Sequence, residues 1–412
     1  MTTENAASSR GWVVVLAALG INLILGALYA WGVLAKALVV QWHWSRTEAA
    51  MPFTVSTVAF ALMMVFAGRA QDKLGPRWIA LCGGLLFGLG LIASSFATTP
   101  LMMLLTYGVV GGCGIGLGYS ATTPPAIKWF PPAKKGLITG LVVSGVGVAA
   151  VYISPLTQFL LGQTTISRTF LILGIGTSLI IALLSLLLVN PPAGYVPAAS
   201  AGPAARPAAA PRRDYDWHEM LRTPRFYQLW AMFVLTASAG LMIIAHVAII
   251  AKEQAAWQWG FVPVALLAIF NTTGRIVSGY LSDRIGRTQT MLLAFLLQSL
   301  NMFLFAFYTT PALLVFGSAC TGLCYGTIFT LMPSATADFY GVRHLGVNYG
   351  LVFTAFGVAG VLGPILGGML RDHSGSYTAS YLLSAVMLLL AAGLAFFTRP
   401  PRPAAETAGP GR

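Results

Sequence analysis

The sequence predicts an all-helical membrane protein in which twelve spanning helices form two six-helix halves. Of its 412 residues, 57% are apolar and only 8% are charged, whereas a soluble domain carries roughly 25% charged residues. Apolar runs of about 20 residues, long enough to cross roughly 30 Å of hydrocarbon as helices, recur along the whole chain. A loop pattern that follows the second run returns after the eighth. These three observations indicate a duplicated helical bundle that spans the lipid bilayer.

The apolar runs place each span to within a few residues. The predicted spans are 11–36, 48–68, 77–97, 100–121, 136–161, 168–189, 226–250, 257–281, 288–308, 311–332, 346–369 and 376–398. The stretch between the sixth and seventh is rich in Pro and Ala and has no spanning apolar run, which is typical of a linker. We therefore expect an N-terminal bundle at 1–190, a cytoplasmic linker at 191–222 and a C-terminal bundle at 223–412.

Basic residues gather in alternate loops, and this pattern sets the expected orientation. Most of the 24 Lys and Arg residues lie on the side that holds both termini. The opposite side holds Lys36, Arg46, Arg168, Lys252 and Arg371. By the positive-inside rule both termini are expected in the cytoplasm. The net charge of +13 is therefore explained by membrane orientation, and we expect no nucleic-acid partner.

The repeated loop reads GRAQDKLGPR at residues 68–77 and GYLSDRIGRT at residues 279–288. Both copies follow the pattern G-x-x-x-D-[RK]-x-G with basic residues after it. Their aspartates can accept hydrogen bonds from a nearby helix N-terminus, and their basic residues can bridge neighbouring helices. The alternative is a pair of ordinary turns. The predicted gating residues are Asp72, Lys73, Arg77, Asp283, Arg284 and Arg287.

These paired loops resemble the signature of the major facilitator superfamily, and the resemblance covers the whole chain. It implies the fold of that family, an all-α membrane protein with 12 transmembrane helices in two pseudo-symmetric six-helix bundles around a central cavity. A superfamily fold does not choose a substrate, so the polar residues inside the spans must do so.

Arg275 is the only clear charge inside a span, because the acidic residues lie in loops, the linker, the tails or at span ends. It stands about 12 Å from the end of its helix at 1.5 Å per residue. An arginine at mid-membrane costs about 2.5–3.5 kcal/mol. Its planar fork suits a carboxylate, and Asn271 lies one turn earlier on the same face. The alternative is an arginine that pins helices together through backbone carbonyls.

Local stretches narrow the resemblance to one branch of the superfamily. GWVVVLAALG, WFPPAKKGLITGLVVSGVG, EMLRTPRFYQLW and NYGLVFTAFGVAGVLGPILGG look like the branch of the monocarboxylate transporters and the oxalate–formate antiporter. In that branch the arginine of the eighth span binds substrate, and Arg275 matches it. The resemblance implies a bacterial homologue in the inner membrane.

Three positions depart from the pattern of that branch. Animal monocarboxylate transporters carry an aspartate tied to proton coupling where this chain has Asn271, and a first-helix lysine where it has Val33. The oxalate–formate antiporter has a second cationic residue where this chain has Phe356. One arginine balances one carboxylate, so the substrate expected here is a monoanion such as lactate or pyruvate.

A small organic anion also needs apolar walls and orienting hydroxyls. Glycines precede Tyr119 in the fourth span and flank Tyr325 in the tenth, which leaves room for both rings. Leu28 and Tyr29 lie on the first span, and Phe356 is expected on the far wall. For each of these five residues the alternative is packing within the helical core.

No cofactor, metal site or enzymatic activity is expected. The four cysteines fall in apolar segments, no phosphate-binding loop is present, and the spans contain no acid or activated nucleophile. His246, in the seventh span, could carry a proton or simply pack in the core. The predicted function is secondary transport of a small monocarboxylate by alternating access, with a proton as the expected co-substrate. The alternatives are an anion exchanger of the oxalate–formate type and a sensor that binds ligand without transport.

Overall fold

The computed structural model describes residues 3–192, 194, 195, 197 and 214–399, with side chains from residue 9 onward. Most of the predicted linker and the whole C-terminal tail lie outside these residues. Within the described part, twelve helical segments are long and apolar enough to cross a membrane, and no strand occurs. The predicted all-helical fold with twelve spans is therefore confirmed. The boundaries predicted for the two bundles and the linker stay predictions.

The N-terminal half supplies six of these spans. Its elements are α1 (Thr3–Leu25), η1 (Gly26–Ala30), α2 (Trp31–Gln41), α3 (Arg46–Leu74), α4 (Pro76–Ser94), α5 (Pro100–Met103), the π-helical η2 (Leu104–Gly111), α6 (Gly112–Ser120), α7 (Thr123–Lys128), η3 (Pro132–Lys134), α8 (Lys135–Gln163) and α9 (Ile166–Ser185). The start of α3 carries a clear sequence signal. Ser45 and Glu48 form a reciprocal capping box at the start of α3, which pairs two of its otherwise unbonded N–H groups.

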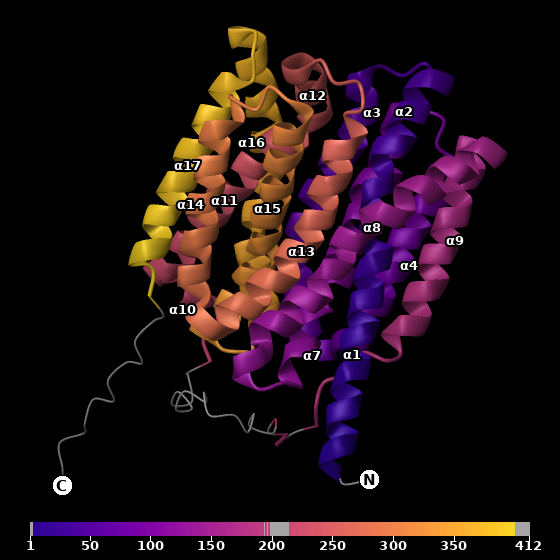
Figure 1. Cartoon of the computed structure of the whole chain (residues 1–412). Coiled ribbons are helices and arrows are strands. Elements are labelled where there is room, and N and C mark those ends of the chain that lie inside the picture. Colours follow the sequence, from indigo (N-terminus) through magenta and orange to yellow (C-terminus); the bar gives the residue numbers. More distant parts are fainter. Residues whose placement is uncertain (1–2, 193, 196, 198–213, 400–412) are drawn as a thin grey trace, which may run out of the picture.

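The C-terminal half repeats this arrangement. Its elements are α10 (Trp217–Leu221), α11 (Pro224–Ile244), α12 (Val247–Ala255), α13 (Phe261–Ile285), α14 (Arg287–Phe305), α15 (Pro311–Tyr340), α16 (Leu345–Ser374) and α17 (Thr378–Phe397). In Figure 1 the two halves stand side by side, and the described chain ends near α1 and α17 lie toward the same end of the molecule.

The last glycine of the repeated loop has the same conformation in both halves. Gly75, between α3 and α4, has a φ of 89°, and Gly286, between α13 and α14, has a φ of 105°. A side chain is strained in this left-handed region, so glycine is required for the chain to reverse there. The chain reverses at this glycine, three residues after the aspartate of each loop.

The seventh span is shorter than the predicted 226–250 because the helix breaks at His246. The His246 ring nitrogen Nδ1 lies 2.8 Å from the Met242 carbonyl oxygen, the acceptor that continued α-helix would use. The His246 backbone N–H donates instead to Ile243, at 2.9 Å. Competition by a side chain for a helical carbonyl ends or bends a helix. The chain then resumes as α12.

Two helix pairs form the seam between the halves, α3 with α16 and α8 with α13. Glycines let these helices meet backbone to backbone. A Cβ at Gly68 would overlap Gly346, and a Cβ at Gly136 would overlap Gly279. Such close approach of small residues is the usual way helices associate in lipid. These contacts lie at one end, where α3 and α13 finish and α8 and α16 begin, which we call the basic end.

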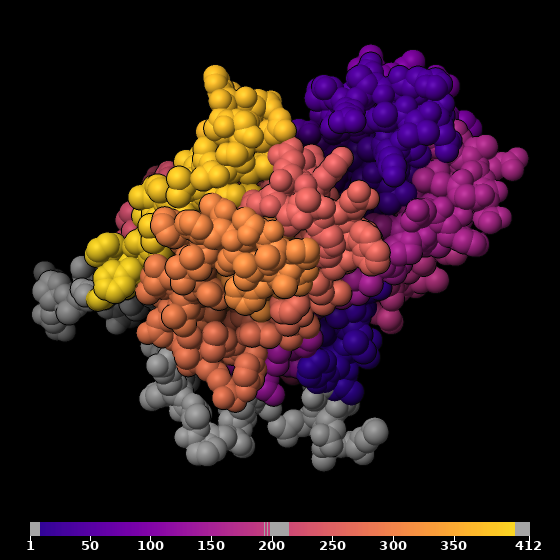
Figure 2. All heavy atoms as spheres, turned by 45° about the horizontal axis from the view of Figure 1, so that its top comes forward, coloured from indigo at the N-terminus to yellow at the C-terminus, as the bar shows by residue number. Residues whose placement is uncertain are grey.

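The opposite end of the molecule is less tightly closed. Close glycine contacts across the seam extend outward as far as Gly147 against Thr272 and Gly360 against Thr57. Figure 2 brings this opposite end forward and shows a notch there between the yellow C-terminal and indigo N-terminal segments. The structure is therefore a state closed at the basic end.

Candidate functional site

Asp72, at the end of α3, is bonded to the other half of the molecule. Its carboxylate accepts hydrogen bonds from the backbone N–H groups of Gly346 and Val347, at 3.1 and 3.0 Å. Both donors lie in the first turn of α16, where the helix dipole and its unpaired N–H groups favour an anion. The first aspartate of the repeat thus joins the two bundles at the basic end.

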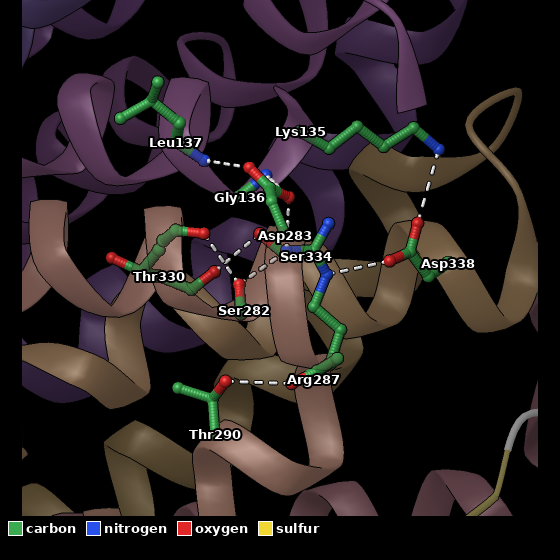
Figure 3. A network of polar contacts seen from close by, with 12 residues as sticks. Lys135, Gly136, Leu137, Ser282, Asp283, Arg287, Thr290, Thr330, Ser334 and Asp338 are labelled. Carbon is green, nitrogen blue, oxygen red and sulfur yellow. Dashed lines mark hydrogen bonds and ion pairs between the residues drawn. The ribbon is translucent and has the colours of Figure 1, made fainter. Parts of the chain in front are cut away.

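Asp283, at the end of α13, makes the corresponding bonds in the opposite direction (Figure 3). Its carboxylate accepts from the backbone N–H groups of Gly136 and Leu137 in the first turn of α8, both at 2.8 Å. Arg287 also donates to Asp283, at 2.7 Å, and to the Ser282 hydroxyl. This second carboxylate is thus bonded to both bundles and has a resident cation.

A chain of ion pairs extends this contact along the basic end. Arg287 donates through Nε to Asp338 of α15, at 2.8 Å. Lys135, at the start of α8, reaches the other oxygen of Asp338 at 3.5 Å. Lys135 and Asp338 stand in different bundles, so this pair must separate when the basic end opens. Neither residue belongs to the repeated loops, which is why the motif did not point to them.

The basic residues of the two loops do not all bridge helices as expected. Arg77 lies over the ring of Trp78 at 5.8 Å, and Arg284 lies over Tyr280 at 4.5 Å. No ion pair of the described residues uses Lys73, Arg77 or Arg284; only Arg287 makes the predicted bridge. The first loop has no counterpart of Arg287, because the position four residues after Asp72 is occupied by Pro76.

Arg275 of α13 lies at the seam, about midway along the helix, and is only 1% exposed. Its Nε donates to the Asn271 side-chain oxygen at 3.0 Å, and Nη1 donates to the Val143 carbonyl at 2.5 Å. Val143 belongs to α8, in the other bundle. The guanidinium also lies 4.8 Å from the centre of the Phe329 ring. Arg275 therefore points across the seam toward the other bundle and is partly capped by protein.

The protein contacts of Arg275 leave some of its N–H groups free to donate to a ligand. A guanidinium has five N–H groups, and the hydrogen bonds above use two of them. Within the described part of the chain Nη2 makes no hydrogen bond and no carboxylate pairs with Arg275. Two other charged side chains among the described residues are nearly as buried, Arg287 and Asp283, at 8% and 7% exposed, and these two pair with each other. Arg275 thus combines burial, free donors and a missing counter-charge.

An aromatic cluster connects Arg275 with most of the predicted wall residues. Tyr325 and Phe356 both pack against Phe329, with ring centres 5.2 and 5.3 Å apart. Phe60 continues the cluster from the other bundle, 6.3 Å from Phe356 and 5.5 Å from Tyr119. The rings of α3, α6, α15 and α16 therefore meet across the seam beside Arg275.

The two predicted residues of the first span lie on η1. The Tyr29 ring is half-buried and packs against the same hydrophobic core that contains Tyr325. Leu28 is 8% exposed, and its carbonyl lies 3.4 Å from the Tyr107 hydroxyl. A substrate role for each of these residues stays a prediction.

Sequence reasoning missed Val143, Phe329 and Phe60. Phe329 lies four residues after Tyr325 on the same face of α15, a spacing that could have identified it. Val143 contributes only a backbone carbonyl, and nothing in its side chain indicates that role. Phe60 is one of many apolar residues in α3 and becomes distinct only through its place in the cluster.

Comparison with known proteins shows which family has this architecture. Residues 11–309 and 264–412 match the Major Facilitator Superfamily. The chain belongs to the Major Facilitator Superfamily. Its fold is also that of solved superfamily members. The proton:xylose symporter XylE, bound to 6-bromo-6-deoxy-D-glucose, gives a TM-score of 0.72 at 13% identity over 94% of this chain and 96% of that chain. The human organic anion transporter MFSD10 gives 0.67 at 13% identity over 96% and 100%.

Relatives within the superfamily cover nearly the whole chain at modest identity. The uncharacterized transporter YhjX of Escherichia coli is 26% identical over 88% of each chain. The oxalate:formate antiporter of Oxalobacter formigenes is 27% identical over 95% of this chain and 92% of its own length. Monocarboxylate transporter 13 of Rattus norvegicus is 27% identical over 95% and 90%. The protein is thus a transporter of this superfamily rather than an enzyme.

Proposed function

We propose that the protein carries a small monocarboxylate, such as lactate or pyruvate, across the membrane by alternating access, with the carboxylate bound at Arg275. The observation that supports this most is the state of Arg275, which is buried at the seam with free N–H groups and no carboxylate partner in the described chain. An uncompensated charge in a membrane interior is costly and indicates a function. The relatives that act on oxalate, formate or monocarboxylates agree with an anionic substrate.

The contacts between the two bundles at the seam indicate how the transport cycle proceeds. Arg275 belongs to the C-terminal bundle and the Val143 carbonyl to the N-terminal bundle, so an arriving carboxylate competes with a bond that holds the halves together. A carboxylate also neutralises the guanidinium, which lowers the cost of closing a dry cavity around it. The bundles then rock and the bonds of Asp72 and Asp283 break. We assign the basic end to the cytoplasm, with both termini there and the protein in a bacterial inner membrane.

A single cation at the proposed site, Arg275, favours a monoanion. Phe356 lies in the aromatic cluster, at the position where the resemblance implies a second cation in the oxalate–formate antiporter. A dicarboxylate would place a second charge against these rings without compensation. Co-transport of one proton would keep the cycle electroneutral, and this proton is part of the proposal. Lactate flux into proteoliposomes that neither moves protons nor responds to a pH gradient would contradict proton co-transport.

Replacing Arg275 tests the site directly. Arg275→Gln should abolish binding and uptake of labelled lactate by purified protein in vesicles, and Arg275→Lys should recover only a small part, because an ammonium lacks the planar fork. The matched control is Arg168→Gln, which removes an exposed arginine of α9. Unchanged lactate uptake by Arg275→Gln would exclude the site and favour an arginine that only pins helices together.

Exchange of anions is the second candidate, favoured by the similarity to the oxalate:formate antiporter. The two functions differ in their need for a counter-anion. Vesicles loaded with pyruvate, formate or oxalate, or with no anion, should take up lactate equally well if a proton is the partner. Uptake that requires an internal anion would establish exchange. Binding of lactate without any flux would indicate a sensor.

A further inference from the structure

A cleft opens on the outer surface of the C-terminal bundle, between α13 and α14. It has a volume of about 120 Å³ and is lined by residues of α13, α14 and α15, and α15 is seen between the other two helices in Figure 1. The side chains at its rim, Val277, Leu293 and Leu297, are 48%, 55% and 46% exposed. None of the residues of the proposed carboxylate site lines it. The cleft therefore faces the lipid rather than the path between the bundles.

The cleft offers an occupant no free hydroxyl. Three hydroxyls line it, those of Ser278, Thr290 and Thr327, and each donates to a carbonyl three or four residues earlier in the chain, at 3.4, 2.8 and 3.0 Å. The other lining residues are Gly, Ala, Val, Leu and one Cys, whose thiol behaves as a small apolar group. A charged ligand would lose its hydration there without gaining hydrogen bonds. The occupant of the cleft must therefore be apolar.

The cleft lies in the half of the membrane next to the basic end. Along α13 its lining runs from Gly274 to Leu281, and α13 ends at Ile285. Gly274 and Arg284 are ten residues apart, about 15 Å at 1.5 Å per residue, which is half of the roughly 30 Å thickness of the hydrocarbon core. The cleft thus lies within one leaflet and runs along the direction of its acyl chains.

A cation without an ion pair stands where the cleft reaches the basic end. Arg284 comes three residues after Leu281 and seven after Val277, which puts all three on one face of α13. Its side chain is exposed and lies over the Tyr280 ring at 4.5 Å. The neighbouring carboxylate of Asp283 is already bonded to α8. Tyr280 is 46% exposed, and exposed tyrosines of membrane proteins gather at the level of the headgroups. Arg284 therefore holds a free guanidinium at headgroup level, at the end of an apolar cleft.

We propose that this cleft binds an anionic phospholipid, with one acyl chain between α13 and α14 and the phosphate against Arg284. A guanidinium binds phosphate through two parallel N–H donors. The basic end is assigned to the cytoplasm, and the cytoplasmic leaflet carries the anionic lipids. The site lies outside the transport path, so the proposal holds whichever anion the protein carries. A lipid bound there packs α13, the helix of Arg275, against α14 and α15.

Lipid binding to the full-length protein in a neutral detergent tests the site. Native mass spectrometry should show phosphatidylglycerol binding about fivefold or more tightly than phosphatidylcholine with the same chains, which is the effect of one basic group near the membrane surface. Glycerol phosphate has the phosphate without the chains and should not displace phosphatidylglycerol. Equal binding of the two lipids would overturn the proposal. Displacement by glycerol phosphate would also overturn it, because the site would then be one for a free phosphate.

Two pairs of variants test the headgroup contact and the chain contact separately. Arg284→Gln should bring the two lipids to within about twofold, whereas Arg77→Gln, which removes an exposed arginine over Trp78 in the first loop, should keep the preference. Leu293→Trp fills the cleft and should weaken binding of both lipids by about fivefold or more. Leu296→Trp adds the same ring at an exposed position outside the cleft and should bind lipid normally. A full anionic preference in Arg284→Gln, or unchanged binding by Leu293→Trp, would contradict the assignment.

Discussion

Asp72 and Asp283 connect the two bundles by the same bond pattern in opposite directions. Each carboxylate ends one seam helix and accepts two backbone N–H bonds from the first turn of a helix in the other bundle. Hydrogen bonds to a charged group contribute about 1.5–3 kcal/mol each when protected from water. Opening of the basic end must break all four together, so this pair contributes to the stability of the closed state.

Asp283→Asn should loosen the basic end, because it removes the ion pair with Arg287 and weakens the bonds to α8. A Ser334→Cys probe, at a position fully buried in α15, should then react about tenfold faster with a water-soluble thiol reagent, in a background without the native cysteines. Asp372→Asn, a change at an exposed carboxylate of the opposite end, should leave labelling unchanged. Equal labelling in all three proteins would show that the Asp283 carboxylate does not hold the basic end closed.

Arg287 should matter far more for stability than Lys135, although both pair with Asp338. Removing one partner of a buried ion pair costs about 3–5 kcal/mol, whereas a looser pair nearer the surface contributes roughly 0–1 kcal/mol. Arg287→Met should therefore lower the Tm in detergent by several degrees, and Lys135→Met should hardly change it. Arg287→Lys should fall between them. The ranking is wrong if the two methionine variants unfold at the same temperature.

Gly140→Ala should block closure of the basic end. A Cβ there would lie 2.3 Å from the Arg275 carbonyl oxygen across the seam, closer than any real contact, so α8 and α13 would be forced apart. Lactate transport should fall at least about tenfold and labelling of Ser334→Cys should rise. Gly162→Ala, also on α8, meets nothing within 4 Å and should transport normally. Normal transport by Gly140→Ala would mean that the seam tolerates separation there.

Asn271→Asp should make transport depend more strongly on pH. The new carboxylate would stand where the Asn271 oxygen now accepts from Arg275 at 3.0 Å, and it would compete with the substrate for the guanidinium. Protonation of this aspartate at low pH removes the competition. The KM for lactate, divided by that of the unmodified protein at the same pH, should therefore rise at pH 7.5 and fall toward one near pH 5. A ratio independent of pH would contradict this account.

Much of the architecture was predictable because individual residues indicate how deep in the membrane a segment lies and which face of its helix is buried. The spans can be placed from the length of the apolar runs. The two copies of the repeated loop share one shape because Gly75 and Gly286 both adopt a positive φ. The position of Arg275 within its span identifies a buried charge, and the four-residue spacing places Asn271 beside it. The break at His246 was not predictable, since it arises from a side chain competing for a backbone carbonyl.

The apolar runs, the repeated loop pattern and the arginine inside a span specify a two-half bundle of twelve helices, loops that hold helix ends together, and an interior charge that needs a counterpart. Which groups that charge and its neighbours contact depends on how the helices pack. The Val143 carbonyl and the Phe329 ring reach this charge from helices far away in the chain. Helical periodicity specifies the face on which a side chain lies, whereas its partner across the seam depends on how two rigid bundles pack.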